Sequence, residues 1–273
     1  MNAVYLGGPA LGLGKDYYQK VNDANTKTLV EYKNFASQLF TVLGYSNADA
    51  TAQKVVDFEK VLANYLLTNE QGRDANLRYN PKTTAELGAL VKSVNLPNYL
   101  SSVGVNTDRV IVTELKYYQN LDSIITSKNL PLLKDYMKFH MLRSNLGNLD
   151  QKMDQLNFNF YSKYLQGQKE QRPMEKRGLQ MVNGVLGEAF GKLYVEKYFP
   201  AEAKVKMEEY ISYIRKAFSK RIDGLDWMSP ETKVKAQEKL SKFGVKIAYP
   251  DTWRDYSKLT MKAPQDGGTY YGN

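Results

Sequence analysis

The 273-residue chain contains no cysteine and a single histidine, His140. The absence of cysteine excludes disulfide bonds, thiolate ligands for zinc and a cysteine nucleophile. A single histidine cannot form an H-E-x-x-H helix, in which two imidazoles four residues apart bind one metal ion. A Ser-His-Asp triad needs only one histidine, but the chain has no Gly-x-Ser-x-Gly turn to carry the serine. These hydrolytic motifs are therefore missing from the sequence.

The one histidine allows two interpretations. His140 could act as a general base, because an imidazole can exchange a proton near neutral pH. Alternatively, it is a packed side chain on or beside the apolar face of a helix marked by Leu133, Met137 and Met141. No acid or nucleophile motif accompanies it, so we favour the packed imidazole.

Long apolar runs and nucleotide-binding loops are also absent. No stretch approaches the roughly 20 apolar residues that span a bilayer, and residues 1–16 lack the basic region of a signal peptide. The compartment stays open between the cytoplasm and the bacterial periplasm or exterior. The pair Gly12 and Gly14 lacks the third glycine and the preceding strand of a dinucleotide fingerprint.

Basic residues exceed acidic ones, 38 against 29, which gives a net charge of +9. Nowhere are three basic residues consecutive, whereas a nucleic-acid-binding arm usually contains a block of them. A lysine-rich solvated surface is the favoured interpretation, and no nucleic-acid partner is expected. A module that binds other polyanions is a further hypothesis, because charge influences association.

Apolar residues recur at intervals of three and four through most of the chain, which is typical of amphipathic helices. The clearest runs are Leu29, Tyr32, Phe35, Leu39 and Val42, and later Met207, Ile211, Ile214, Phe218, Ile222 and Leu225. Residues 109–113 are β-branched enough for a strand but too few to imply a sheet. The sequence therefore predicts an all-α fold with at most a short strand near 109–113. Residues 1–16, 70–81 and 167–178 are predicted loops.

Several helix ends can be placed from local chemistry. Gly44 is expected to end one helix, and the stretch from Ser46 to Asp49 to begin the next. Thr83 or Thr84 could cap a later helix, which Pro97 would stop. Ser229 followed by Pro230 is a typical helix start.

Three glycines, Gly184, Gly187 and Gly191, fall on one face of a predicted helix. Their spacing predicts a buried helix with another backbone lying close to this smooth face. A ligand approaching the face is the less favoured alternative. Glu188 and Lys192 on the same helix are four residues apart and are predicted to form an ion pair.

Three sequence blocks, in the same order and with suitable spacing, resemble the neprilysin, endothelin-converting enzyme and oligopeptidase O family of zinc metallopeptidases. They are V-N-G-V-L-G-E-A-F-G-K-L-Y-V-E-K-Y-F over 182–199, L-D-W-M-S-P-E-T-K over 225–233, and V-K-I-A-Y-P-D over 245–251 with W-R-D-Y-S following at 253–257. A weaker match is L-G-L-G-K-D-Y-Y over 11–18. Ala248 stands where the family usually has glycine. Without cysteine, the chain resembles the bacterial branch.

The resemblance implies a metalloendopeptidase in which a mostly helical lobe covers a thermolysin-like catalytic lobe. The cavity between the lobes would admit only short peptides. In the family, zinc is bound by H-E-x-x-H and a downstream glutamate, and none of these motifs occurs in this sequence. We therefore assign no catalytic, cofactor-binding or metal-binding residue to this chain, and expect zinc only in the full-length enzyme.

The resulting prediction has two parts. Residues 1–248 would be the helical cap-lobe region, and residues 249–273 the start of a connector toward the catalytic lobe of the same polypeptide. The chain would form the wall of a size-selecting cavity in an enzyme that hydrolyses short peptides, and would be inactive alone. Both ends suggest a fragment or a truncated product. The alternative is a stand-alone helical scaffold or peptide-binding protein without enzymatic activity.

Overall fold

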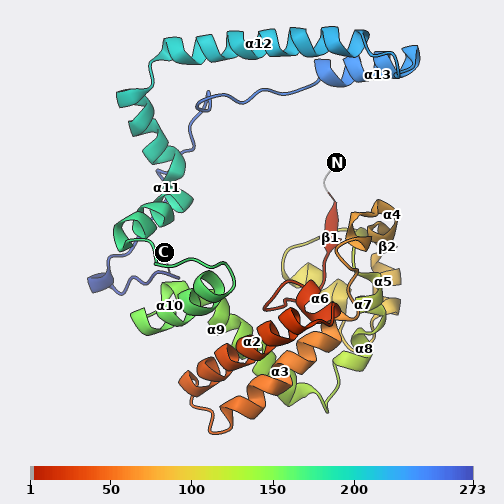
Figure 1. Ribbon diagram of the computed structural model, residues 1–273, viewed down its shortest axis with the longest axis vertical. Helices are drawn as coiled ribbons and strands as arrows, with labels where there is room; N and C mark the ends of the chain where they lie inside the picture. Colours follow the sequence, from red (N-terminus) through yellow and green to blue (C-terminus); the bar gives the residue numbers. More distant parts are fainter. Residues whose placement is uncertain (1–2, 273) are drawn as a thin grey trace. The chain divides into compact units, whose positions relative to one another are not determined.

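The computed structural model describes residues 3–272 and consists mainly of helices (Figure 1). The chain forms two compact units, one ending at Glu170 and the other beginning at Gln171. No helix among the described residues is long and apolar enough to cross a membrane. The predicted all-α class is confirmed, with a small sheet added. The predicted boundary at residue 248 concerns lobes of a larger enzyme and stays a prediction.

The first unit contains all three strands and the helices up to α10. In chain order its elements are β1 (Val4–Leu6), α1 (Asp16–Gln19), α2 (Asp23–Val42), α3 (Ala48–Ala63), a 3₁₀ turn (Gln71–Arg73), α4 (Ala75–Arg78), β2 (Asn80–Thr83), α5 (Thr84–Leu90), α6 (Leu96–Ser102), β3 (Arg109–Val112), α7 (Leu115–Gln119), α8 (Leu121–Ile124), α9 (Leu130–Asn145), a 3₁₀ turn (Leu146–Asn148), α10 (Gln151–Asn157) and a π-helical turn (Phe158–Tyr164).

The predicted strand is the centre of a three-stranded sheet. β3 pairs in parallel with β1, where Tyr5 lies opposite Ile111, and antiparallel with β2, where Pro81 lies opposite the same residue. The strand near 109–113 is present, but it is not the only one, and the sheet that it forms was not expected from its few residues. β1 lies in the predicted loop 1–16, and β2 begins at the end of the predicted loop 70–81. β1 is separated from β3 by about a hundred residues, a pairing that local periodicity cannot reveal.

Helices α2 and α3 run side by side as an antiparallel hairpin, and α9 packs against both (Figure 1). An aromatic cluster fills the space between them, and the rings of Phe35 and Phe160 stack with centroids 4.9 Å apart. Burial of each such side chain contributes about 2 kcal/mol to stability. The buried members of the cluster include Tyr32, Phe35, Leu39, Phe40, Phe139 and Phe160. A second cluster joins α3 to the sheet, α5 and α8.

The turn between α2 and α3 follows the predicted chemistry. Gly44 has φ +81° and its N–H donates to Thr41, while the N–H of Tyr45 donates to Phe40. These two bonds form a Schellman motif, completed by edge contact between the Phe40 and Tyr45 rings, 5.1 Å apart. The expected side-chain cap of α3 is absent from the described residues: Asn47 occupies the N-cap position without a side-chain bond.

Of the other predicted helix ends, two are confirmed and one is wrong. Thr83 forms a complete capping box with Glu86 at the start of α5, and Ser229 accepts from the N–H of Thr232 at the start of α13. Both helix starts are confirmed. Pro97 does not stop a helix; it lies in the first turn of α6, where its missing N–H costs nothing. The preceding helix already ends at Leu90.

The buried face of α9 differs from the predicted one. Met137 is 67% exposed and Met141 is 74% exposed, so these residues do not mark the face that enters the core. The core side chain of α9 is Phe139, and His140 beside it is mostly buried. Methionines spaced at i, i+4 lie on one face of the helix, but α9 packs against the aromatic cluster of α2 and α3 with the face that carries Phe139.

The second unit comprises three long helices and a returning segment. α11 (Met174–Tyr198) is followed by α12 (Ala201–Asp223), α13 (Pro230–Ser241) and a short 3₁₀ turn (Pro264–Asp266). α13 turns back along α12 (Figure 1). The predicted amphipathic helix over α12 is present, but of its apolar residues only Ile222 is buried, while Ile214 is 50% and Phe218 54% exposed.

The glycine face of α11 is open at two of its three glycines, whereas Gly191 contacts Trp253. Side chains added at Gly184 or Gly187 would meet no atom within 4 Å, and none of the helix's described residues is buried. The prediction of a buried helix is therefore wrong for this unit. The helix bends at Leu186, whose φ and ψ of −116° and 25° are not helical.

Candidate functional site

His140, the one sequence candidate for chemistry, faces a buried carboxylate. Its Nε2 atom lies 2.7 Å from Oε1 of Glu59, and the Glu59 side chain is fully buried. With the carboxylate as acceptor, the imidazole donates from Nε2. α3 supplies the glutamate and α9 the histidine. The sequence analysis found no acid partner for His140, because the two residues are 81 positions apart.

Glu59 receives three further hydrogen bonds. The backbone N–H of Gly12 and the hydroxyl of Tyr32 donate to Oε1, each over 3.1 Å, and the hydroxyl of Tyr18 donates to Oε2 over 2.7 Å. Four donors thus converge on one acceptor-only group, which a buried carboxylate needs in order to offset its loss of water. The cluster joins the N-terminal segment to α1, α2, α3 and α9.

Tyrosines around Glu59 are held in their neutral form. Burial raises the pKa of Tyr18 and of Tyr32, and the negative charge of Glu59 raises both further. Burial likewise raises the pKa of Tyr136 and of Tyr161. A neutral hydroxyl can donate to the carboxylate, so the direction of these shifts agrees with Tyr18 and Tyr32 as donors to Glu59.

The same cluster fixes the segment before α1. The hydroxyl of Tyr161 donates to the carbonyl of Gly12 over 2.9 Å, and the N–H of Leu13 donates to Tyr18 over 3.2 Å. A Cβ atom at Gly12 would lie 1.5 Å from the Tyr32 hydroxyl, so only glycine fits. All these contacts tie chain segments together, which agrees with the interpretation of His140 as a packed imidazole.

No metal site is formed by the described residues, among which no group of three or more histidine, aspartate or glutamate side chains could hold an ion. Glu59 and His140 are only two donors, and Tyr18 and Tyr32 occupy the remaining space around the carboxylate. This donor set does not fit zinc, which takes three or four protein ligands.

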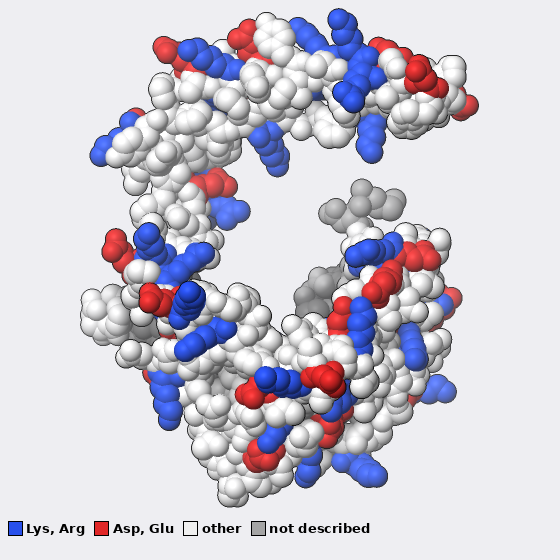
Figure 2. Space-filling model, in the orientation of Figure 1, with Lys and Arg blue, Asp and Glu red and all other residues white. Residues whose placement is uncertain are grey.

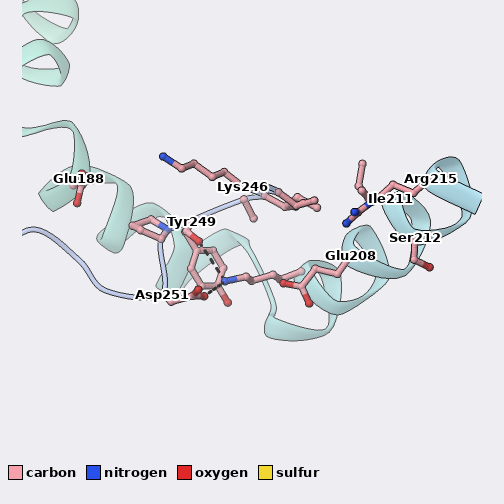
Figure 3. A pocket seen from close by; sticks show the side chains of 13 residues that line it. Glu188, Glu208, Ile211, Ser212, Arg215, Lys246, Tyr249 and Asp251 are labelled. Carbon is pink, nitrogen blue, oxygen red and sulfur yellow. Dashed lines mark hydrogen bonds and ion pairs between the residues drawn. The ribbon is translucent and has the colours of Figure 1, made fainter. Parts of the chain in front are cut away.

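A large pocket lies in the second unit and has a volume of about 930 Å³. One wall is α12, and the other is the segment that returns from α13, residues 245–251. Figure 3 shows Arg215 and Ile211 at one end, and the side chain of Lys246 reaching toward Glu188 at the other. Glu208 lines the pocket between them. The pocket thus combines apolar side chains with charges of both signs.

Ionic contacts hold the returning segment in place beside this pocket. The Lys204 ammonium donates to the carbonyl of Tyr249 over 3.3 Å, forms an ion pair with Asp251 and lies 4.6 Å from the centroid of the Tyr249 ring. The ion pair raises the pKa of Lys204 and lowers that of Asp251. Farther along, the N–H of Arg254 donates to Glu188 over 2.8 Å. This last contact is not the one predicted for Glu188, whose expected partner was Lys192.

Two of the three sequence blocks meet at this segment. Trp253 lies against Gly191 of α11, where an added Cβ would be 3.5 Å from its ring, and stacks with Tyr249 at 5.9 Å. The remaining block, residues 225–233, forms the corner between α12 and α13, where Trp227 is 78% exposed. Two blocks that are far apart in sequence therefore contact each other in the fold.

The sequence matches the model of Peptidase family M13 over residues 1–250. The chain belongs to peptidase family M13. This confirms the resemblance to the neprilysin-like zinc metallopeptidases. Mouse (Mus musculus) endothelin-converting enzyme 1 is 30% identical to this M13 chain over 267 residues, covering 94% of the chain and 35% of the relative. The neutral endopeptidase of Lactococcus lactis is 27% identical over 256 residues, covering 92% of the chain and 40% of the relative.

Solved structures agree with this assignment. Zinc metalloprotease Zmp1 of Mycobacterium tuberculosis, solved with an inhibitor, is 28% identical and superposes with a TM-score of 0.83, covering 94% of this M13 chain and 39% of that protein. PepO from Lactobacillus rhamnosis shares the fold, with a TM-score of 0.84 at 22% identity. The match covers 96% of this chain and 42% of the PepO chain. The M13 chain thus spans about a third of the length of the first curated relatives.

Glu59 is the main residue that sequence reasoning missed. It follows Val55 by four positions and precedes Leu62 by three, so it lies on the apolar stripe of α3. A charged residue at such a position must find partners in the core. That signal could have identified Glu59 as buried, although not its partner. Elsewhere, Figure 2 shows basic and acidic side chains mixed over the face drawn, in line with a solvated surface.

Proposed function

We propose that this chain is the non-catalytic helical part of a zinc metalloendopeptidase that hydrolyses short peptides. The observation that supports the proposal is the family match over residues 1–250, within a chain that corresponds to only a third of its relatives. Zinc would be bound by residues outside this chain, because its single histidine is engaged with Glu59. The chain alone would not cleave peptides.

In the proposed enzyme, the helices form one wall of the cavity that receives the substrate. Residues 1–248 would belong to the cap lobe, and residues 249–273 would begin the connector to the catalytic lobe of the same polypeptide. The wall would exclude large substrates and water from the reaction. Many large apolar side chains of α11 and α12 are exposed, which suits surfaces that meet another part of a protein.

A chimera tests the proposal directly. The part of Lactococcus lactis neutral endopeptidase that matches this chain would be replaced by residues 1–273, with the rest retained. We expect a zinc-containing enzyme that cleaves internally quenched peptides of about ten residues and leaves a denatured protein substrate intact. A folded, zinc-loaded chimera that cleaves both substrates alike would contradict the role of size-selecting wall. The chain alone should show no zinc-dependent cleavage.

The second hypothesis is a helical scaffold or peptide-binding protein that works without a catalytic partner. The pocket of about 930 Å³ favours it, because the pocket is formed entirely within the second unit. Tight binding of short peptides by the isolated chain, combined with a chimera that folds but has no activity, would make this hypothesis the better one.

A further inference from the structure

The returning segment beside the large pocket has unpaired backbone groups. Among the described residues, the N–H and C=O groups of Val245, Lys246 and Ile247 form no hydrogen bond. The segment has no regular secondary structure. Unpaired backbone along a pocket offers hydrogen-bond donors and acceptors to a ligand.

Contacts hold the chain on either side of this segment. Before it, the guanidinium of Arg215 donates from Nη2 to the carbonyls of Leu240 and Ser241, over 3.0 and 3.2 Å. After it, Lys204 binds the carbonyl of Tyr249 and the carboxylate of Asp251. Anchors on both sides limit the freedom of the segment, and this reduces the entropic cost of binding a ligand between them.

Backbone strain lies within the same stretch. Ala248 has φ +60°, the left-handed region that disfavours residues with a Cβ atom. A non-glycine residue in this conformation costs about 1 kcal/mol and persists only where its surroundings enforce it. Such strain is concentrated at binding sites and switches.

The side chains around the pocket indicate which ligand fits. Ile211, Val245 and Ile247 supply apolar contacts. At the Arg215 end, two carbonyls use only one guanidinium nitrogen, so the others can donate to an anion. A carboxylate is the anion that matches guanidinium geometry best.

We propose that residues 245–247 bind a short peptide in extended conformation as an added strand, with the peptide's C-terminal carboxylate at Arg215. Main-chain bonds would give affinity independent of sequence, and Ile211 would contact an apolar side chain of the peptide. Three residues at roughly 3.3 Å each pair with about three residues of the peptide, which a pentapeptide covers with residues to spare. The proposal rests on the proposed function only in taking a peptide as partner.

The first test measures binding to the intact chain by fluorescence anisotropy. The probe is the pentapeptide Ala-Leu-Ala-Leu-Ala with fluorescein on its amino terminus. We expect saturable one-to-one binding, weakened about tenfold by C-terminal amidation and about tenfold or more by N-methylation of alternate residues. N-methylation removes backbone donors from the peptide and leaves the protein unchanged, so misfolding cannot explain the loss.

Variants locate the site. Arg215→Gln should abolish the difference between the free and amidated peptides, whereas Arg221→Gln on the same helix should preserve it. Circular dichroism checks that both variants fold. Equal binding of all three peptides, or an unchanged amidation effect in Arg215→Gln, would overturn the proposal.

Hydrogen–deuterium exchange gives a second readout. The amides of residues 245–248 should exchange rapidly in the free chain and slow down when the pentapeptide is present. Protection that is absent with peptide, or already complete without it, would also overturn the proposal. Neither result affects the chimera experiment, so failure of this site is distinguishable from failure of the proposed function.

Discussion

Oε1 of Glu59 lies 2.7 Å from Nε2 of His140, across 81 positions of sequence and inside the core of the first unit. The same carboxylate also accepts from Gly12, Tyr18 and Tyr32. Four elements of structure therefore depend on one side chain. Because the group is buried and every neighbour is a donor, removing it leaves several polar groups without partners.

The first prediction concerns this carboxylate. Glu59→Ala should lower the free energy of unfolding by about 3–5 kcal/mol, the usual cost of removing one partner from a buried charged network. Asp57→Ala is the matched control on the same helix: Asp57 is half exposed and pairs only with solvent-exposed neighbours, so its loss should cost under about 0.5 kcal/mol. Urea unfolding followed by far-UV circular dichroism measures both. Equal effects of the two substitutions would contradict the structural role of Glu59.

The second prediction concerns Gly12. Gly12→Ala places a methyl group 1.5 Å from the Tyr32 hydroxyl, inside a core that cannot open without losing the bond to Glu59. We expect a loss of about 3 kcal/mol, as for other overpacked sites. Gly14→Ala is the control, because its Cβ would meet nothing closer than 3.9 Å. Thermal unfolding of the two variants provides the comparison, and similar melting temperatures would show that the segment can move aside.

The third prediction is a loss of stability at alkaline pH. The pKa values of Tyr18, Tyr32, Tyr136 and Tyr161 are raised by burial, and that of Tyr118 is raised to about 12. Between the unfolded pKa near 10 and the folded values, the folded chain keeps protons that the unfolded chain releases. The contribution of these tyrosines to the free energy of unfolding is therefore complete below about pH 10 and falls as the pH rises above it.

Urea midpoints measured from pH 8 to 11 should show this decline. Tyr18→Phe is the test variant: it lowers stability at pH 8, because a buried hydrogen bond is lost, yet flattens the decline above pH 10. A slope identical to that of the parent would show that Tyr18 ionises equally in both states. Tyr5, which is 62% exposed, provides the control substitution Tyr5→Phe.

The sequence predicted features set by near neighbours. Gly44 and Thr83 act within a few residues, so the turn and the capping box follow from local chemistry. Pairings such as Tyr5 with Ile111, or Glu59 with His140, depend on how distant segments meet. The exposed Met137 shows the same limit, because an apolar residue at helical spacing does not by itself reveal which face the core will select.

The fourth prediction tests the contact between α11 and the returning segment. Gly191→Val would push β-branched carbons into the Trp253 ring, which already lies 3.5 Å from an added Cβ. In a Trp227→Phe background, Trp253 is the sole tryptophan, and its emission should shift to the red as the ring moves into water. Gly184→Val on the same helix meets open space and should leave the emission unchanged. A red shift in both variants would indicate general helix damage instead.

The fifth prediction concerns the strained residue beside the pocket. Ala248 adopts φ +60°, where glycine carries no Cβ penalty. Ala248→Gly removes a strain of about 1–2 kcal/mol but gives the unfolded chain more freedom, so we expect a net gain of about 0.5–1 kcal/mol. Both tryptophans lie in the second unit, so urea unfolding followed by their fluorescence reports on this unit. Ala263→Gly serves as the control, because Ala263 has φ −68° and should lose stability on the same change. If Ala248→Gly destabilises the second unit as much as Ala263→Gly does, the contacts of Lys204 do not hold Ala248 in the left-handed conformation. The segment that we propose as the peptide site would then lack the backbone conformation described here in solution.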